Sequence, residues 1–175
     1  GGRAIGLTGK DGNLLTAKKL SLNSNKSSDL NHIDLGRVGE IATVDTDFLY
    51  FLKNGDFVPV IAPIGLGDDN KSYNINADLV AGKIAESVKA EKLILMTNVE
   101  GIKDSEGNLI SVADRALMEG LVKNNVISEG MIPKVNSALD AVENGVLRAH
   151  IIDGRQQHSL LLELFTDEGI GTLIE

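Results

Sequence analysis

Three short polar side chains alternate with small apolar ones in the segment YNINAD, where Asn74, Asn76 and Asp78 lead into an amphipathic helical pattern. This row has two interpretations. In the first, an Asn caps the helix and the acid lies favourably in its first turn, at the positive end of the helix dipole. In the second, two amides and a carboxylate between a strand end and a helix start form a site. The stretch alone leaves both open.

A lysine stands at an unfavourable position in the segment EGMIPKVNSALDA (129–141). Pro133 suits a first helical turn, so Lys134 lies near a helix N-terminus, where the dipole disfavours a cation. The ammonium group either extends into solvent or meets an anion such as a phosphate. With Asp78 and the amides it would form a set of groups suited to phosphoryl transfer, in which a cation stabilises the transition state and a carboxylate orients the cations.

The elements that would position these groups alternate between apolar strands and helices, which predicts an open α/β sheet. Residues 4–8 and 14–20 are expected to form a hairpin through the turn at 10–13. The segment 57–98 is expected to be a βαβ crossover with two buried strands. Further strands are expected in 36–45, 149–154 and 169–175, and helices in 46–55, 77–90, 114–124, 134–144 and 159–165.

The crossover helix is expected to bury Leu79, Val80, Ile84 and Val88, which recur at helical spacing. In an open α/β sheet, ligands bind at the carboxyl ends of the strands. We therefore expect GLGDDN, TNVEG and DGR, which follow three predicted strands, to converge around a small polar ligand.

Composition and missing motifs exclude several classes of protein. A net charge of −8 argues against a nucleic-acid surface, and the absence of cysteine excludes disulfides and thiolate chemistry. No apolar run is long enough for a membrane span, so we expect a cytoplasmic protein. The GxxxxGK[ST], GxGxxG and GxSxG motifs are absent. His32, His150 and His158 lack metal-ligand spacing, and no metal site is predicted.

Several strings resemble, in order along the chain, the acetylglutamate kinases of the amino-acid kinase family. They are GLTGKDGNLLTA, LGRVGEI, YNINAD, KLILMTNVEGI, EGMIPKV and HIIDGRQQHSLLLELFTDEGIGT. The resemblance implies a three-layer αβα fold with a mainly parallel sheet and a β-hairpin region near the N-terminus. It implies phosphorylation of the γ-carboxylate of N-acetyl-L-glutamate by ATP with Mg²⁺, in arginine biosynthesis.

The resemblance also implies roles for the polar row and the lysine. Asn74 and Asn76 would bind the acetylglutamate substrate, and Asp78 would hold the catalytic lysines in place. Lys134 would be catalytic and would bind the ATP phosphates.

Further residues are implied to bind the nucleotide and a regulator. Asn98, Gly101 and Met131 would line the nucleotide site, although the family more often has Asp at the position of Asn98. The C-terminal string is similar to that of arginine-inhibited members. By that likeness His150, Glu163 and Gly169 would form an arginine site, with Glu163 meeting the guanidinium group in a bidentate pair.

The family's N-terminal lysine, its HGGGP-like loop and its acceptor-gripping arginine are absent from this sequence. We therefore expect a fragment that lacks the N-terminal part of the fold and is inactive alone. Residues 1–90 would belong to the acceptor domain and 91–175 to the nucleotide domain. A homo-oligomer and a PII regulator are implied for arginine-sensitive relatives. Two alternatives stay open: a nucleotide- or arginine-binding module without catalysis, and another amino-acid kinase such as a glutamate 5-kinase-like enzyme.

Overall fold

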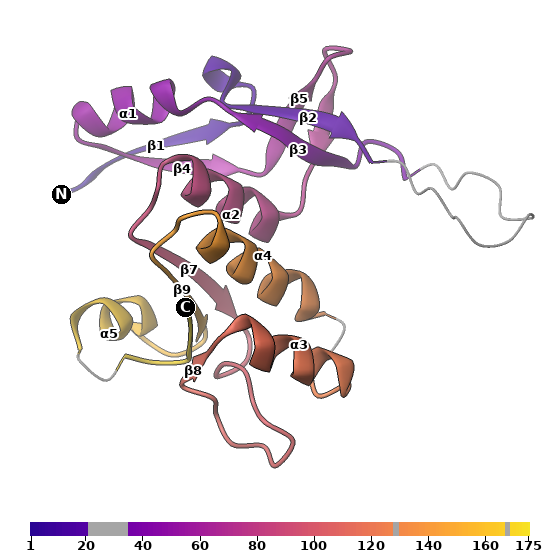
Figure 1. Cartoon of the computed structure of the whole chain (residues 1–175). Helices are drawn as coiled ribbons and strands as arrows, with labels where there is room; N and C mark the ends of the chain where they lie inside the picture. The colour runs from indigo at the N-terminus through magenta and orange to yellow at the C-terminus, as the bar shows by residue number, and fades with distance from the viewer. Residues whose placement is uncertain (21–34, 128–129, 167–168) are drawn as a thin grey trace, which may run out of the picture. The chain divides into compact units, whose positions relative to one another are not determined.

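The computed structural model describes residues 1–20, 35–127, 130–166 and 169–175. The chain forms two compact units, Gly1–Val80 and Ala81–Glu175 (Figure 1). Four of the seven strand pairs among the described residues are parallel, and three are antiparallel. The predicted α/β class with mainly parallel pairing is confirmed, and the strands are divided among three sheets.

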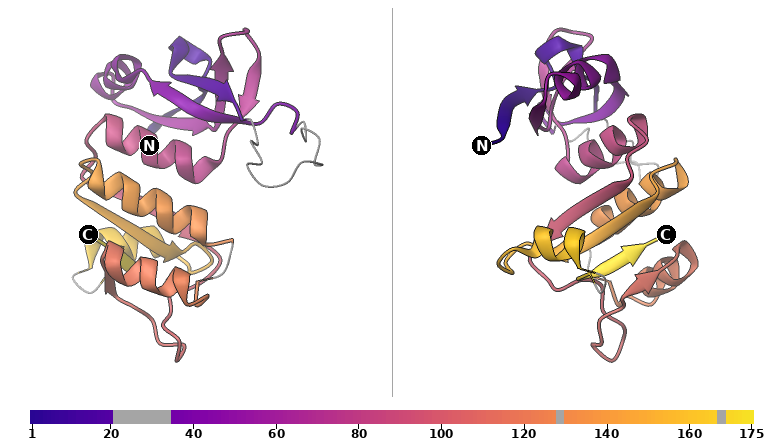
Figure 2. Two further views of the ribbon diagram at one scale, coloured as in Figure 1. Left: turned by 45° about the vertical axis from the view of Figure 1, so that its right-hand side comes forward. Right: turned by 90° about the vertical axis from the view of Figure 1, so that its left-hand side faces the viewer.

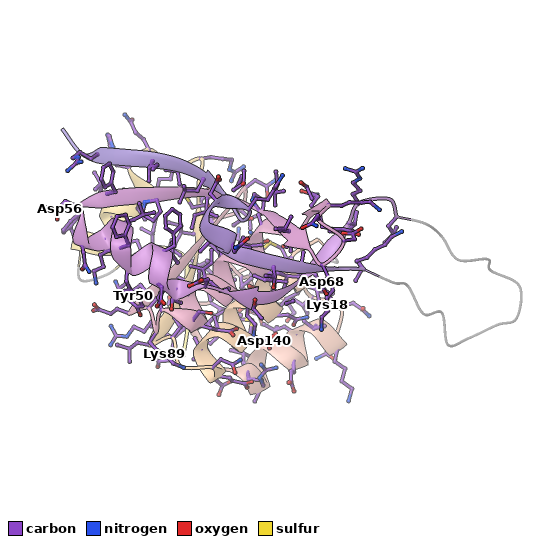
Figure 3. The ribbon with its side chains drawn as sticks, turned by 90° about the horizontal axis from the view of Figure 1, so that it is seen from above. Lys18, Tyr50, Asp56, Asp68, Lys89 and Asp140 are labelled. Carbon is purple, nitrogen blue, oxygen red and sulfur yellow. The ribbon has the colours of Figure 1, made fainter. Side chains whose placement is uncertain are left out.

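The first unit holds two of these sheets. One pairs β1 (Arg3–Thr8) with β4 (Phe57–Ala62). The other has the order β3-β2-β5-β6, made of Gly39–Val44, Leu15–Lys19, Ile64–Gly67 and Ser72–Asn74. The helix α1 (Thr46–Asn54) begins at its cap Asp45, which accepts a hydrogen bond from the Asp47 amide, and ends at Gly55. Figure 3 labels Tyr50, which lies on this helix and is partly exposed, and Asp56, directly beyond its end.

The predicted hairpin of the first two strands is wrong, because β1 and β2 belong to different sheets. The Asp11 carboxylate accepts hydrogen bonds from the backbone amide and the hydroxyl of Thr8, at 2.7 and 2.9 Å. The chain then forms a short 3-10 helix (Asp11–Asn13), and the Gly9 amide donates to the Ile64 carbonyl. The turn therefore directs β2 beside β5 and not back along β1.

The predicted buried strand 57–64 is also corrected. It is split at Pro63 into β4 and β5, as expected where proline removes a ladder donor. Val58 and Val60 are 60% and 59% exposed. They alternate onto one face of β4, and the described residues leave that face open. Among these residues β4 pairs only with β1, and β7 only with β9, so the predicted βαβ crossover within one sheet is not formed.

The helix α2 (Ala77–Ser87) runs from the first unit into the second. Val80 is buried as predicted, but Leu79 is 42% exposed. Consecutive helix positions lie about 100° apart, so the two side chains do not share one narrow face. The predicted burial of Leu79 is wrong.

The second unit has one sheet of the order β7-β9-β10-β8. Its strands are Lys92–Thr97, Arg148–Asp153, Thr172–Ile174 and Val112–Ala113. The helices α3 (Arg115–Lys123) and α4 (Ile132–Glu143) lie on one side of this sheet, and α5 (Ser159–Phe165) lies on the other (Figure 2). The core of the unit is formed between the sheet and α4, where Leu95, Leu139 and Ile151 are buried.

The burial of β7 differs from the prediction on one face of the strand. Leu93 and Leu95 are buried, whereas Met96 on the same strand is 49% exposed. The apolar run LILM therefore covers the core with one face only. Among the described residues, no helix has the length and apolarity that a membrane crossing requires.

Candidate functional site

A cavity of about 500 Å³ lies in the second unit, beyond the carboxyl ends of β7 and β9. These strands are parallel neighbours, with Thr97 opposite Asp153, and the Gly154 amide donates to the Thr97 carbonyl at 2.8 Å. The cavity is lined by the loop 98–104, by Val126, Ile127 and Met131, and by Arg155. Two of the three predicted segments, TNVEG and DGR, therefore meet where the sheet rule places a ligand.

The third segment, GLGDDN, is corrected from a loop to part of a β-hairpin. Gly67 ends β5, and Asp68 marks the turn toward β6 in the first unit (Figure 3). The Asp69 carboxylate accepts a hydrogen bond from the Lys71 amide at 3.1 Å and from the Tyr73 hydroxyl at 3.0 Å. These bonds close a tight turn between the antiparallel strands.

The loop at the cavity is held by one buried hydroxyl. Thr172 on β10 is fully buried; its Oγ1 accepts from the Ile102 amide at 2.8 Å and donates to the Ile110 carbonyl at 2.7 Å. Gly101 has a φ of +153°, and a Cβ there would lie 2.8 Å from Thr172 Oγ1. The glycine is therefore needed where the loop passes over β10.

The beginning of α4 supplies another wall. Met131 precedes the helix, and the Thr97 hydroxyl donates to its sulfur at 3.6 Å. The structure thus brings three of the four residues predicted to bind a nucleotide, Asn98, Gly101 and Met131, into one cavity. The fourth, Lys134, is not among the lining residues, and its contact with the nucleotide stays a prediction.

Two ion pairs stand at this cavity. Lys103 Nζ lies 2.8 Å from Glu100 Oε2. The Arg155 side chain forks onto Asp153, with Nε 3.0 Å from Oδ1 and Nη2 2.8 Å from Oδ2. These charge-assisted bonds, with the Arg155 backbone amide, lower the pKa of Asp153 to about 2. The sequence predicted that DGR lies at this site, but it did not predict Lys103 or the paired bonds between Arg155 and Asp153.

The polar row belongs to the first unit. Asn76 Oδ1 accepts from the amides of Asp78 and Leu79, at 2.9 and 3.2 Å. The capping interpretation is therefore confirmed for Asn76. Asn74 ends β6 with an exposed side chain, and its backbone amide donates to the Arg37 carbonyl at 2.8 Å.

Asp78 lies in the first turn of α2 and is half-buried. Lys134 lies in the first turn of α4, after Pro133, and is half-buried as well. The helix position predicted for each of them is confirmed. Asp78 belongs to the first unit and Lys134 to the second, and their joint action stays a prediction.

A second cavity, of about 510 Å³, contains the residues predicted to bind arginine. Its lining includes Lys92, His150, Glu163 and Gly169. Glu163, on α5, is 5% exposed; its Oε1 lies 2.7 Å from His150 Nδ1 and 3.9 Å from Lys92 Nζ. Its Oε2 accepts from the Ile170 amide at 2.9 Å. The cavity thus presents a buried carboxylate already surrounded by donors.

His150 in this cavity is held neutral by its burial. Removal from water lowers its pKa below the ordinary value of 6.5, and the Glu163 carboxylate opposes this only in part. A neutral imidazole that donates from Nδ1 presents a lone pair at Nε2. That nitrogen is buried and has no hydrogen-bond partner among the described residues.

No role is proposed for the other two histidines. His158 is the residue before α5, with a φ of +60° and no side-chain capping bond. His32 lies outside the described residues. No cluster of three or more His, Cys, Asp or Glu side chains that could hold a metal occurs in the part of the chain that is described.

Comparisons with known proteins give a family and several relatives. The family model described as "Amino acid kinase family" matches residues 1–153. An acetylglutamate kinase from Acinetobacter baylyi is 55% identical over 175 residues, which cover 99% of this chain and 58% of that protein. One from Azoarcus sp. is 53% identical over 100% of this chain and 58% of its own length. The chain therefore spans a little over half the length of these relatives.

A solved structure extends the comparison. It is that of N-acetylglutamate synthase from Neisseria gonorrhoeae, complexed with coenzyme A and L-arginine. It matches with a TM-score of 0.83 and 30% identity, over 99% of this chain and 38% of the other.

Proposed function

The chain belongs to the amino acid kinase family, and we propose that it forms the nucleotide-binding part and a portion of the acceptor-binding part of an acetylglutamate kinase. The reaction is transfer of the γ-phosphoryl group of ATP to the γ-carboxylate of N-acetyl-L-glutamate. The observation that carries this proposal is the cavity in which Asn98, Gly101 and Met131 meet. The identity of 53–55% with acetylglutamate kinases favours this acceptor over that of other amino-acid kinases.

The nucleotide fits the cavity in size and chemistry. About 500 Å³ is within the range of small-molecule sites, and the lining combines apolar side chains with loop backbone and a few charges. Mg²⁺ would arrive with the nucleotide, because this ion is held largely by substrate phosphates and water and needs only one or two carboxylates. When bound, it would neutralise charge on the phosphates.

The protein's own groups act by position and charge. Lys134, at the start of α4, would contact the transferring phosphates, and Asp78 would orient the lysine ammonium groups toward them. Asn74 and Asn76 would bind the acceptor, with the cap formed by Asn76 as its second role. Residues 1–90 would belong to the acceptor domain and 91–175 to the nucleotide domain.

The chain alone is proposed to lack turnover, because the relatives are longer and the family's N-terminal lysine and glycine-rich loop are absent from it. Cytoplasmic location, homo-oligomerisation and a PII regulator belong to the same proposal and rest on the resemblance alone.

A regulatory role is favoured by the second cavity. We propose that Glu163, His150 and Gly169 bind arginine, with the guanidinium group paired to the buried carboxylate. The support is the burial of Glu163 among donors and the arginine named in the complex of the N-acetylglutamate synthase relative. The chain could then bind arginine or a nucleotide without catalysing a reaction.

Titration calorimetry separates these functions. MgADP, arginine and acetylglutamate are titrated into the unaltered chain, Lys134→Ala and Glu163→Gln. If the unaltered chain binds MgADP and the Lys134→Ala variant binds it more weakly, the kinase proposal is supported. If the chain binds only arginine, the regulatory module is supported. A coupled ADP assay then compares the chain with and without an added N-terminal segment from a relative. Absence of MgADP binding, together with no restored turnover, would reject the kinase proposal.

A further inference from the structure

Arg155 is a charged residue at the nucleotide cavity whose side chain is held in place by an ion pair. Its guanidinium group uses Nε and Nη2 on the nearly buried carboxylate of Asp153, and its backbone amide donates to the same carboxylate at 2.8 Å. The side chain is nevertheless 64% exposed. A guanidinium group has five N–H donors, so the fork leaves three donors and the flat face available.

The charges around the cavity argue against a phosphate chain as the ligand of Arg155. The lining carries two cations, Lys103 and Arg155, and two anions, Glu100 and Asp104. Lys103 is paired with Glu100, and Arg155 is paired with Asp153. Each cation is therefore neutralised by a near neighbour. A strongly anionic group gains little from such a site, because attraction by the cations is offset by repulsion from the carboxylates.

A flat, neutralised guanidinium group suits a different partner. Guanidinium is more weakly hydrated than ammonium and stacks on aromatic faces. The rest of the lining includes Val126, Ile127 and Met131, which provide apolar surface for a ring. The lysine proposed to contact phosphates, Lys134, is not among the lining residues.

We propose that Arg155 is a specificity-determining residue of the nucleotide site, which packs its guanidinium plane against the purine ring of the nucleotide. Asp153 acts as the positioning residue that holds this plane in place. The cavity thus takes the nucleoside half of the nucleotide, and the phosphates extend beyond it. This inference rests on the proposed nucleotide binding and adds to it the residue that recognises the base.

The test uses Arg155→Lys, which keeps the charge but loses the plane and the fork. Isothermal titration of the 175-residue chain with MgADP is combined with competition by adenosine and by tripolyphosphate. The matched control is Arg115→Lys, because Arg115 lies on α3 and pairs with Asp140 and Glu143 outside the cavity lining. Circular dichroism verifies that both variants fold.

Arg155→Lys is expected to lower the affinities for adenosine and for MgADP by the same factor, roughly threefold to thirtyfold, as for a lost cation–ring contact. Tripolyphosphate affinity is expected to stay unchanged, as is every affinity of Arg115→Lys. An equal loss of tripolyphosphate affinity would show that Arg155 binds phosphates. An unchanged adenosine affinity would show that Arg155 does not contact the base. Either result overturns the inference and leaves the kinase proposal intact. An unaltered chain that binds no MgADP overturns the inference, and it also rejects the kinase proposal if an added N-terminal segment restores no turnover.

Discussion

The Thr172 hydroxyl connects the cavity loop to the sheet, and its removal tests how the site is held. Thr172→Val replaces the hydroxyl by a methyl group of similar size on a fully buried strand residue. The change leaves no large void. It removes the acceptor of the Ile102 amide and the donor of the Ile110 carbonyl.

The magnitude follows from those two bonds. A buried polar group left without a partner costs about 1–3 kcal/mol, so the two groups together could lower the free energy of unfolding by about 2–6 kcal/mol. The Ile110 amide still donates to the Ile102 carbonyl at 2.8 Å, so these two segments stay partly paired, which favours the lower half of that range. Loosening of residues 98–104 should also weaken MgADP binding, because this loop lines the cavity.

Urea unfolding measures the effect. With a slope near 2 kcal/mol per molar urea, the midpoint should fall by about 1–2 M without a change in slope. The control is Thr166→Val, which removes an exposed hydroxyl that donates to the Leu162 carbonyl, where water can replace it. A Thr172→Val midpoint no lower than that of Thr166→Val would show that the Thr172 hydroxyl does not hold the loop.

Three further changes probe the second unit. Gly171 has a φ of +79°, and a Cβ there would lie 2.2 Å from the Ile151 carbonyl oxygen. Gly171→Ala should therefore lower the unfolding free energy by at least about 1 kcal/mol more than Gly107→Ala, whose φ is +88° in open space; equal urea midpoints would contradict this. Asp114→Ala removes the cap that accepts from the Leu117 amide at 2.8 Å and should cost about 1 kcal/mol. Asp114→Asn should keep most of that stability, and an equal loss would exclude capping. The folded-state pKa of Asp153 is lowered from 3.8 to about 2, so its stabilising contribution is complete above pH 4 and is lost as pH falls through 2. The stability difference between the unaltered chain and Asp153→Asn should shrink from pH 4 to pH 2, and a constant difference would contradict the fork.

The helices could be predicted from the sequence because their signals are local. The helices expected in 46–55, 114–124 and 134–144 begin at Thr46, Arg115 and Ile132, within two residues of the prediction. The meeting of TNVEG and DGR was also predictable, because parallel neighbouring strands bring their carboxyl ends to one edge.

Strand partners were less predictable, because pairing is decided by residues far apart in the sequence. The turn after β1 resembles a hairpin turn, and only the bonds of Asp11 and Gly9 reveal that β2 pairs elsewhere. Likewise, FVPVIA has the pattern of a buried strand, although Val58 and Val60 are exposed. The fork of Arg155 on Asp153 required side-chain geometry, since a two-residue spacing alone does not predict it.

The central claim is that the loop after β7, the start of α4 and Arg155 form a nucleotide site. The most direct test is to titrate the isotope-labelled chain with MgADP and to monitor the amide chemical shifts by NMR. The shifts are expected to be concentrated in residues 98–104, Met131 and Arg155, and the amide signals of strands β2 and β3 are expected to stay unchanged. If the amide signals of residues 98–104 do not shift at saturating MgADP, the nucleotide does not bind at this loop.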